Sequence, residues 1–393
     1  MQVRLILVAA AVMAAAVVAW ALIGRGDGTR APAGFEVALQ DNAVFIDPGP
    51  RYDRELAFRR LRELHVTWLR ATLIWARAAA PSDNSPVAPA TVKWDWGPYD
   101  SLVDAARRHG IEVEFTLVGA APAWAAGDHK RGFVRPDAAR YGEFAGAAAA
   151  HFRGRVHRYS IWNEPNLDYW LKPQSEAPAI YRSLYTAGYG AVKRADPGAE
   201  VLIGETAGPA QAGRVLPALP FMREVACRGP DLRPLRPCAK LVADGFAYHP
   251  YDFRHPPEYR YPGAGDVTIG SLDRLTGFLD GMARAGALSA PDGRGLDVYL
   301  TEFGYFARGG RAVPPAVRAQ WLPRAFEIAR RGYPRVRQML QYELLGPDPA
   351  TPSGFFDTAL LSADGSETPS FSALADWGRR EARRGGIAEP RAP

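Results

Sequence analysis

The chain has 393 residues, of which 47% are hydrophobic and 23% are charged, and its 39 glycines and 34 prolines stay below the share of roughly a quarter that marks low-complexity sequence. This composition excludes a disordered or collagen-like chain. The formal net charge is +6, but the arginines that dominate the basic residues are spread along the whole chain. Because nucleic-acid binders concentrate basic residues on one element, we expect no nucleic-acid partner.

The amino-terminal segment is almost entirely apolar from Leu5 to Gly24. About 20 such residues suffice to cross a hydrocarbon core of about 30 Å, so residues 1–24 are expected to form a membrane anchor. The small residues of Ala19-Trp20-Ala21 also fit a cleavage site, so a cleaved signal peptide stays open as the alternative. Either interpretation exports the chain beyond a linker at residues 25–33, as an anchored or a secreted protein.

Eight short apolar runs alternate with amphipathic segments along the rest of the chain. This alternation is typical of a parallel sheet with helical crossovers, and eight units fit a closed (β/α)8 TIM barrel of about 250 residues or more. We therefore expect an α/β fold with one barrel domain over residues 34–384 and a tail at 385–393. The expected strands are Phe35–Leu39, Val66–Arg70, Val113–Leu117, Val156–Trp162, Val201–Gly204, Gly245–His249, Val298–Glu302 and Gln338–Leu344.

The only two cysteines, Cys227 and Cys238, flank a proline-rich stretch at residues 228–237. In an exported protein such a pair commonly closes a loop, so a disulfide is expected, with two unpaired thiols as the alternative. Two sulfurs without a nearby histidine cannot fill a tetrahedral site, so no metal site is expected there.

Two glutamates end expected strands. Glu164 follows the fourth strand in Trp-Asn-Glu-Pro, and Glu302 follows the seventh in Thr-Glu-Phe-Gly. Reactive groups of such barrels lie at the carboxyl ends of the strands. A single strand-end glutamate is ordinarily a partner in a surface ion pair, but glycoside hydrolysis needs two carboxyl groups that face one bond. The pair therefore indicates a glycosidase.

The sequence resembles clan A glycoside hydrolases, and most closely family 39, which includes β-xylosidases, α-iduronidases and exopolysaccharide hydrolases. The resemblance implies a retaining hydrolase of an extracellular poly- or oligosaccharide, with Glu164 as acid/base and Glu302 as nucleophile. It implies no metal and no organic cofactor. The segments that carry it are Val66–Arg70, Pro122–Ala125, Ile161–Asn166, Ala247–Tyr251, Thr301–Gly304 and Gly365–Leu374.

Neighbouring polar residues fit supporting roles in the same chemistry. Asn163 is expected to hydrogen-bond the sugar 2-hydroxyl. Arg70 and Tyr251 are expected to hold Glu302 ionised, since a cation and a hydroxyl donor both favour a carboxylate. His249 is expected to be a neutral hydrogen-bonding wall of the site. An ordinary ion pair for the arginine and a core position for the histidine remain the alternatives.

Aromatic residues near the strand ends are candidates for stacking on sugar rings or, alternatively, for packing against the barrel. They are Trp75, Trp124, Trp162 and Trp170. On the eighth strand, Gln341 stands where the family commonly has a tryptophan platform, which leaves the identity of the sugar open. Glu205 and Asp41 either line the pocket or bond to loops.

A protein of another class remains as the alternative: a catalytically silent barrel that binds carbohydrate for adhesion or polysaccharide export. The presence of both Glu164 and Glu302 argues against it, and the departure at Gln341 argues weakly for it. Transglycosylation by the same two glutamates is a third possibility. The sequence makes no prediction of oligomeric state, linkage, or endo or exo action.

Overall fold

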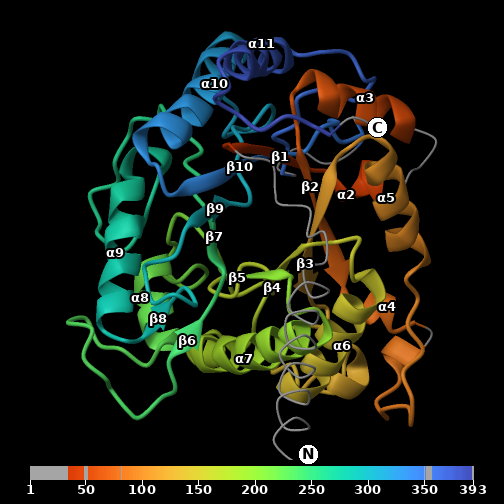
Figure 1. Ribbon diagram of the computed structural model, residues 1–393, viewed down its shortest axis with the longest axis vertical. Helices are drawn as coiled ribbons and strands as arrows, with labels where there is room; N and C mark the ends of the chain where they lie inside the picture. The colour runs from red at the N-terminus through yellow and green to blue at the C-terminus, as the bar shows by residue number, and fades with distance from the viewer. Residues whose placement is uncertain (1–33, 48–51, 81, 349, 351–355, 392–393) are drawn as a thin grey trace, which may run out of the picture. The chain divides into compact units, whose positions relative to one another are not determined.

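Eight parallel strands close into a barrel in the order β1-β10-β9-β7-β5-β4-β3-β2 (Figure 1). The computed structural model describes residues 34–47, 52–80, 82–348, 350 and 356–391. Each of the eight expected strands overlaps one barrel strand, with ends that differ by up to four residues, so the expected barrel is confirmed. The strands are β1 (Glu36–Gln40), β2 (Trp68–Ile74), β3 (Glu112–Val118), β4 (Arg158–Ile161), β5 (Glu200–Ala207), β7 (Gly245–His249), β9 (Val298–Leu300) and β10 (Val336–Tyr342).

Helices surround the strands on the outside of the barrel (Figure 1). Their ends follow local sequence rules. Asp53, Asp137 and Thr368 each accept a hydrogen bond from an amide in the first turn of the helix that follows, and Gly110 and Gly286 come just after helix ends with positive φ. The longer helices are α3 (Arg54–Glu63), α5 (Gly97–Arg108), α6 (Ala138–Phe152), α7 (Ala177–Ala195), α8 (Ala218–Val225), α9 (Leu272–Arg284), α10 (Pro315–Gly332) and α11 (Pro369–Arg383). Short helical segments are α2 (Asn42–Phe45), α4 (Trp75–Ala78), η1 (Ser82–Asn84), η2 (Ala123–Ala125), η3 (Gln174–Glu176) and η4 (Ile269–Ser271).

Two further strands, β6 (Leu241–Val242) and β8 (Leu288–Ser289), pair with each other outside the barrel. With two residues each they are too short to give a periodic pattern, so the sequence does not predict them. The expected tail packs onto the barrel over its described part, because Ile387 pairs with Phe35 and Arg391 forms an ion pair with Glu112.

The expected membrane anchor and linker, residues 1–24 and 25–33, lie outside the described residues. Within the part of the chain that the structure describes, no helix combines the length and the apolar character needed to cross a membrane.

At the amino-terminal ends of the strands, one buried arginine lies at the centre of the barrel interior. Arg158 forms ion pairs with Glu36, Glu114 and Glu200, and its guanidinium carbon lies 3.8 Å from the ring centre of Trp68. A buried charge is tolerated only when it is paired and hydrogen-bonded, and this one is. Side chains therefore fill the barrel interior at the amino-terminal ends of the strands. The polar side chains that solvent can reach lie at the carboxyl ends.

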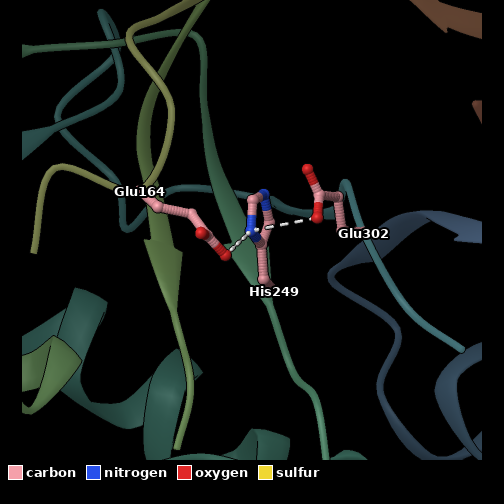
Figure 2. Close-up of side chains that lie close together, drawn as sticks. All are labelled: Glu164, His249 and Glu302. Carbon is pink, nitrogen blue, oxygen red and sulfur yellow. Dashed lines mark hydrogen bonds and ion pairs between the residues drawn. The ribbon is translucent and has the colours of Figure 1, made fainter. Parts of the chain in front are cut away.

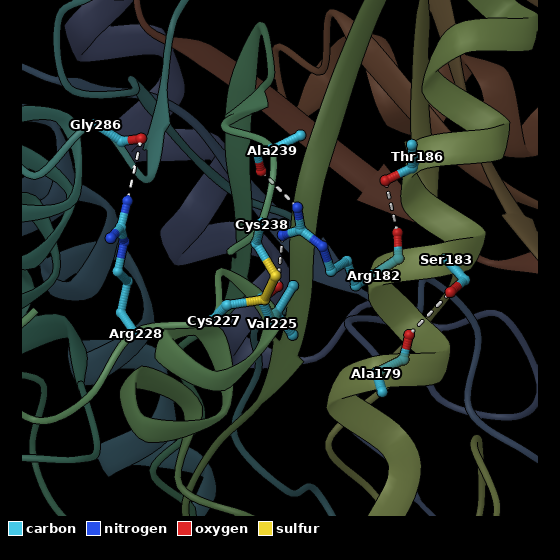
Figure 3. Close-up of a disulfide and its surroundings, with 10 residues drawn as sticks. All are labelled: Ala179, Arg182, Ser183, Thr186, Val225, Cys227, Arg228, Cys238, Ala239 and Gly286. Carbon is cyan, nitrogen blue, oxygen red and sulfur yellow. Dashed lines mark hydrogen bonds between the residues drawn. A yellow bond between two sulfur atoms is a disulfide. The ribbon is translucent and has the colours of Figure 1, made fainter. Parts of the chain in front are cut away.

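The expected disulfide between Cys227 and Cys238 is present, with Cα atoms 6.3 Å apart (Figure 3). Arg182 of α7 reaches over this loop and donates hydrogen bonds to the carbonyl oxygens of Val225 and Ala239 at 2.9 and 2.5 Å. Arg228 donates to the carbonyl of Gly286, beyond α9, at 3.4 Å. The crosslinked loop is thus held against both helices.

Candidate active site

A cleft of 360 Å³ lies at the carboxyl ends of the barrel strands. It contains both glutamates that the sequence singles out, together with polar, aromatic and basic side chains from the loops after β4, β5, β7, β9 and β10. Its walls include Asn163, Glu164, Glu302, Trp170, Tyr251, Phe253, Tyr342, Phe356, Arg214 and Arg311.

Glu164 is positioned by the tight turn that follows β4. Its backbone has a φ of 41°, an uncommon conformation for a residue other than glycine, and its amide donates to the carbonyl of Glu205 at 2.8 Å. The fully buried Asn166 ties this turn to β5, because its side chain bonds both the amide and the carbonyl of Ala207. The Glu164 side chain is 14% exposed, so it reaches the cleft.

Glu302 lies deeper and is held on both oxygens. Arg70 donates to its Oε1 at 2.8 Å and the Tyr251 hydroxyl donates to its Oε2 at 3.3 Å. Burial raises the pKa of the Glu302 carboxyl, while the positive charges of His249 and Arg70 oppose that rise. The contacts expected of Arg70 and Tyr251 are therefore present.

The two carboxylates approach the same ring nitrogen of His249. One oxygen of Glu164, one oxygen of Glu302 and a ring nitrogen of His249 all lie within 4.8 Å of one another (Figure 2). His249 Nδ1 is 3.0 Å from Glu164 Oε1 and 3.7 Å from Glu302 Oε2. The barrel thus brings together the two glutamates that stand 138 positions apart in the sequence.

The expectation of a neutral His249 is wrong. The ring is fully buried, which lowers its pKa, but the carboxylates of Glu302, Glu164 and Glu205 outweigh burial and raise the pKa to about 10. Both ring nitrogens therefore act as donors at neutral pH, and His249 is an imidazolium that neutralises part of the charge on the carboxylates.

Glu205 is the residue whose role the sequence does not reveal. It is fully buried, and its Oε2 accepts from Arg70 at 3.1 Å, from Thr301 at 2.8 Å and from His249 Nε2 at 2.7 Å. Although burial raises its pKa, Arg70 and His249 lower it to about 2. Glu205 therefore does not line the cleft; it is a fixed negative charge beneath it.

Arg70 connects the whole cluster. Besides Glu302 and Glu205, it bonds the side-chain oxygens of Gln40 and Asn163. Because the Asn163 oxygen accepts from Arg70 at 2.8 Å, its amide nitrogen is left as the donor toward the cleft. That orientation suits a sugar hydroxyl as its partner.

Two of the expected stacking tryptophans are placed in the core. Trp75 and Trp162 are fully buried, with Trp75 stacked on Phe144 and the Trp162 indole donating to the carbonyl of Trp170. Their ring faces are covered, so the expectation that they stack on a sugar is wrong. Trp124 packs edge-on against Trp75 and is 8% exposed, whereas Trp170 lines the cleft.

The expectation for Gln341 is also wrong, because side chains alternate along a strand. On β10, Gln338 and Leu340 point into the barrel, where they contact Glu114 and Trp68. Tyr342 shares their face and lines the cleft, while Gln341 points outward and donates to the carbonyl of Thr358. Tyr342, and not Gln341, is therefore the β10 residue whose side chain lines the cleft.

Two more acidic groups lie beside the site without lining the cleft. Asp41 caps α2 and accepts from the amides of Leu344 and Leu345, so it bonds to loops. Glu343 accepts from the Thr358 amide at 2.9 Å, and burial raises the pKa of its carboxyl to about 8.

The arrangement of Glu164, His249 and Glu302 would place three ligand atoms around one point. A metal ion needs a neutral imidazole with a free lone pair, however, and both nitrogens of His249 are already directed at carboxylates. The site geometry thus suits acid/base and nucleophilic chemistry better than metal binding.

No protein-family profile matches the sequence, and no curated protein is similar enough to count as a relative. Solved structures do match it. A family 39 glycoside hydrolase from the gut symbiont Bacteroides cellulosilyticus WH2 superposes with a TM-score of 0.64 at 20% identity, over 87% of this chain and 63% of that one. This chain thus spans less than two thirds of the length of that protein.

Two other glycosidases align over a similar share of the chain. A glucosidase from Croceicoccus marinus has a TM-score of 0.57 at 16% identity and covers 88% of this chain and 68% of its own. Xylanase 10B from Thermotoga maritima has a TM-score of 0.53 at 16% identity, with 89% and 97% covered. The chain therefore has the barrel fold of family 39 glycoside hydrolases and their clan A relatives, which is the fold that its sequence motifs imply.

Proposed function

We propose that the protein hydrolyses glycosidic bonds with retention of configuration at the anomeric carbon. The observation that carries this proposal is the spacing of Glu164 and Glu302, whose nearest ligand oxygens lie within 4.8 Å in one cleft. Retaining glycosidases hold the two carboxyl groups about 5 to 5.5 Å apart, whereas inverting enzymes leave about 6.5 to 9.5 Å for a water molecule. The short separation supports direct attack by a carboxylate.

In the first step Glu302 attacks the anomeric carbon while Glu164 protonates the leaving oxygen. His249 donates to Glu164 Oε1, which leaves Oε2 to carry that proton. In the second step Glu164 takes a proton from water, which then releases the sugar from Glu302.

Hydrogen-bond donors around the two glutamates position the nucleophile and the sugar. Arg70 and Tyr251 fix the two oxygens of Glu302, and the amide nitrogen of Asn163 is free to donate to the sugar 2-hydroxyl. That last contact strengthens as the ring becomes cationic, so it lowers the barrier more than it strengthens ground-state binding. An open cleft with aromatic walls supports an oligo- or polysaccharide as substrate.

We also propose that the enzyme acts outside the cytoplasm. The Cys227–Cys238 disulfide supports this, since such bonds persist in oxidising compartments. The apolar run from Leu5 to Gly24 supports retention at a membrane. Fractionation of cells that express the full chain tests this: the protein should stay with the membranes, and release into the medium with a new terminus near Thr29 would show cleavage instead.

The activity is tested by incubating the full-length chain with aryl glycosides and bacterial polysaccharides. Turnover by the wild type, its loss in Glu302→Ala, and survival of Glu164→Ala on activated substrates with rescue by azide are the expected results. An activated leaving group departs without acid help, but nothing replaces the attacking carboxylate. Binding of a polysaccharide without turnover, unchanged in both variants, would favour the silent carbohydrate-binding barrel.

A further inference from the structure

The cleft contains an arginine that has no acidic partner among the residues that the structure describes. Arg311, on the loop after β9, lines the cleft but forms no ion pair and no side-chain hydrogen bond within the described residues. Its guanidinium carbon instead lies 4.8 Å from the ring centre of Phe253 and 4.3 Å from that of Phe306. Aromatic faces hold a cation in place while its edge donors stay free.

A second cation reinforces the first. Arg254, on the loop after β7, forms no ion pair within the described ranges, and burial together with the charge of Arg254 lowers the pKa of Arg311. Two like charges held close together repel each other. An anion bound between or beside them would relieve that repulsion, so the pair favours an anionic ligand.

Arg311 belongs to an aromatic wall that begins at the nucleophile. Tyr251, which donates to Glu302, stacks on Phe253 with ring centres 5.0 Å apart, and Phe253 in turn faces Arg311. Phe356 packs edge-on against both rings. A saccharide that lies along this wall from Glu302 therefore reaches the guanidinium.

The charges on the other walls point the same way. Arg214 also lines the cleft, and its nearest carboxylate, on Asp168, is 4.0 Å away. Of the described side chains that line the cleft, only Glu164 and Glu302 are acidic. Outside the catalytic pair, the charged side chains among the described residues that line the cleft are thus the two cations Arg214 and Arg311.

We propose that the saccharide substrate carries an anionic group, a uronate carboxylate or a sulfate ester, which Arg311 binds with support from Arg254. This inference rests on the proposed glycosidase function and specifies its substrate. A planar guanidinium matches the two oxygens of such a group with parallel hydrogen bonds. Arg70 is not available for this role, because its guanidinium already bonds Gln40, Asn163, Glu205 and Glu302.

Chemically matched polysaccharides test the proposal. Polygalacturonate, alginate, hyaluronan and dermatan sulfate are each compared with their carboxyl-reduced forms, and dermatan sulfate also with its desulfated form. Binding is measured by calorimetry on the Glu302→Ala background, which leaves bound saccharide uncleaved, and release of reducing ends is measured with the wild type. The reduced and desulfated arms tell a carboxylate ligand from a sulfate ligand.

The substitutions address Arg311 directly. At least one acidic form should bind about tenfold more tightly than its neutral counterpart, since a hydrogen-bonded ion pair contributes about that factor. Arg311→Ala should remove most of this advantage, Arg311→Lys should keep part of it, and added salt should weaken it. Arg107→Ala is the matched control: this exposed arginine of α5 lies outside the cleft, so its loss should leave the preference unchanged.

The outcomes separate the inference from the function. Turnover of neutral saccharides with no preference for acidic forms, and no effect of Arg311→Ala on the ratio between them, would overturn the inference and leave the glycosidase proposal standing. A preference for acidic forms in binding that depends on Arg311, with no turnover of any saccharide, would support the anionic ligand and refute the glycosidase.

Discussion

At the scale of single residues, the site is a balance of charges in a buried space. Arg70 pairs with Glu302 and Glu205. His249 pairs with Glu205 and with the partly exposed Glu164, so the two cations share Glu205. Like charges this close cannot all remain ionised without such cations. The charge state of each group therefore depends on all the others.

Glu205→Gln should lower the pKa of His249. The substitution removes the carboxylate at 2.7 Å from His249 Nε2, while Glu164 and Glu302 still face the other nitrogen. Loss of one close anion should lower the pKa from about 10 by about one to three pH units. The imidazole resonances of the labelled protein, followed by NMR across pH, measure this shift.

The matched control is Glu200→Gln, at the opposite end of β5, where the carboxylate pairs with Arg158. It should leave the His249 titration in place. If both variants, or neither, moved that titration, the charge coupling between Glu205 and His249 would be refuted. The alkaline limb of the pH–rate profile should shift to lower pH in Glu205→Gln alone.

Glu343→Gln should change the pH dependence of stability. Burial raises the pKa of Glu343 to about 8, so the folded state binds a proton that the unfolded state releases near pH 4.5. The stability that this proton contributes is complete below pH 4.5 and is lost as pH rises through 8. Glutamine does not titrate, so the free energy of unfolding of the variant should not fall over this range. The difference in the free energy of unfolding, variant minus wild type, should therefore grow by about 1.4 kcal/mol per pH unit in that window.

Urea unfolding at pH 5, 6 and 7 measures the difference. Parallel curves for the two proteins would show that Glu343 is ionised in the folded state. The backbone requirement is the same in both, since glutamine can adopt the same φ of 65° and can accept the Thr358 hydrogen bond.

Some properties of the site residues can be predicted from the sequence, and others depend on contacts between strands. Glu164 and Glu302 are identifiable because each ends an apolar strand run, and their convergence follows from the barrel. The charge on His249 is not identifiable in this way, since it depends on three carboxylates from other strands. The position of Gln341 was recoverable: counting in twos from Gln338 gives Tyr342 as the inward residue.

At the scale of elements, the loop after β4 determines where the acid/base residue lies. The Asn166 side chain accepts from the backbone amide of Ala207 on β5 and donates to the carbonyl of the same residue. It also donates to the carbonyl of Leu216 at 2.7 Å. The loop is therefore fixed to a neighbouring strand and not only to its own. A side chain outside the cleft thus positions Glu164.

Asn166→Ala should lower kcat with little change in KM for an unactivated substrate, whose leaving group needs the proton of Glu164. The substitution leaves the buried backbone groups of Ala207 unpaired, which costs about 1 to 3 kcal/mol, and it frees the turn that carries Glu164. Asn166→Asp is the comparison, since it keeps the acceptor but loses the donor. Wild-type rates in Asn166→Ala would show that the turn holds Glu164 by itself.

The packing of helices against the barrel decides which tryptophans can contact a sugar. Spacing alone does not distinguish a ring that faces a sugar from one that faces a helix, and α6 supplies the partners that cover Trp75: Tyr141 and Phe144. The barrel strands themselves are predictable, because each overlaps a short and mostly apolar run that lies between helical segments. The aromatic wall of Phe253 and Phe356 comes from loops, where no periodic pattern exists.

At the scale of the whole molecule, one crosslink closes the loop between α8 and β6. Replacing both Cys227 and Cys238 by serine should lower the free energy of unfolding by about 2 to 3 kcal/mol, because the unfolded chain regains the freedom that an 11-residue separation removes. Denaturant unfolding of both proteins measures this. The wild type should also show no alkylatable thiol until it is reduced; two reactive thiols without reduction would contradict the crosslink.

The barrel, the cleft and the paired carboxylates together point to Glu302 as the group that attacks the sugar. A 2-deoxy-2-fluoro analogue of whichever glycoside the wild type hydrolyses, with a good leaving group, tests it most directly. The fluorine slows both steps while the leaving group restores only the first, so the glycosyl-enzyme accumulates. Mass spectrometry of the digested protein should find the sugar on Glu302, in the wild type and in Glu164→Ala. A label on Glu164, or turnover of the parent glycoside with inversion and no label, would show that Glu302 is not the nucleophile.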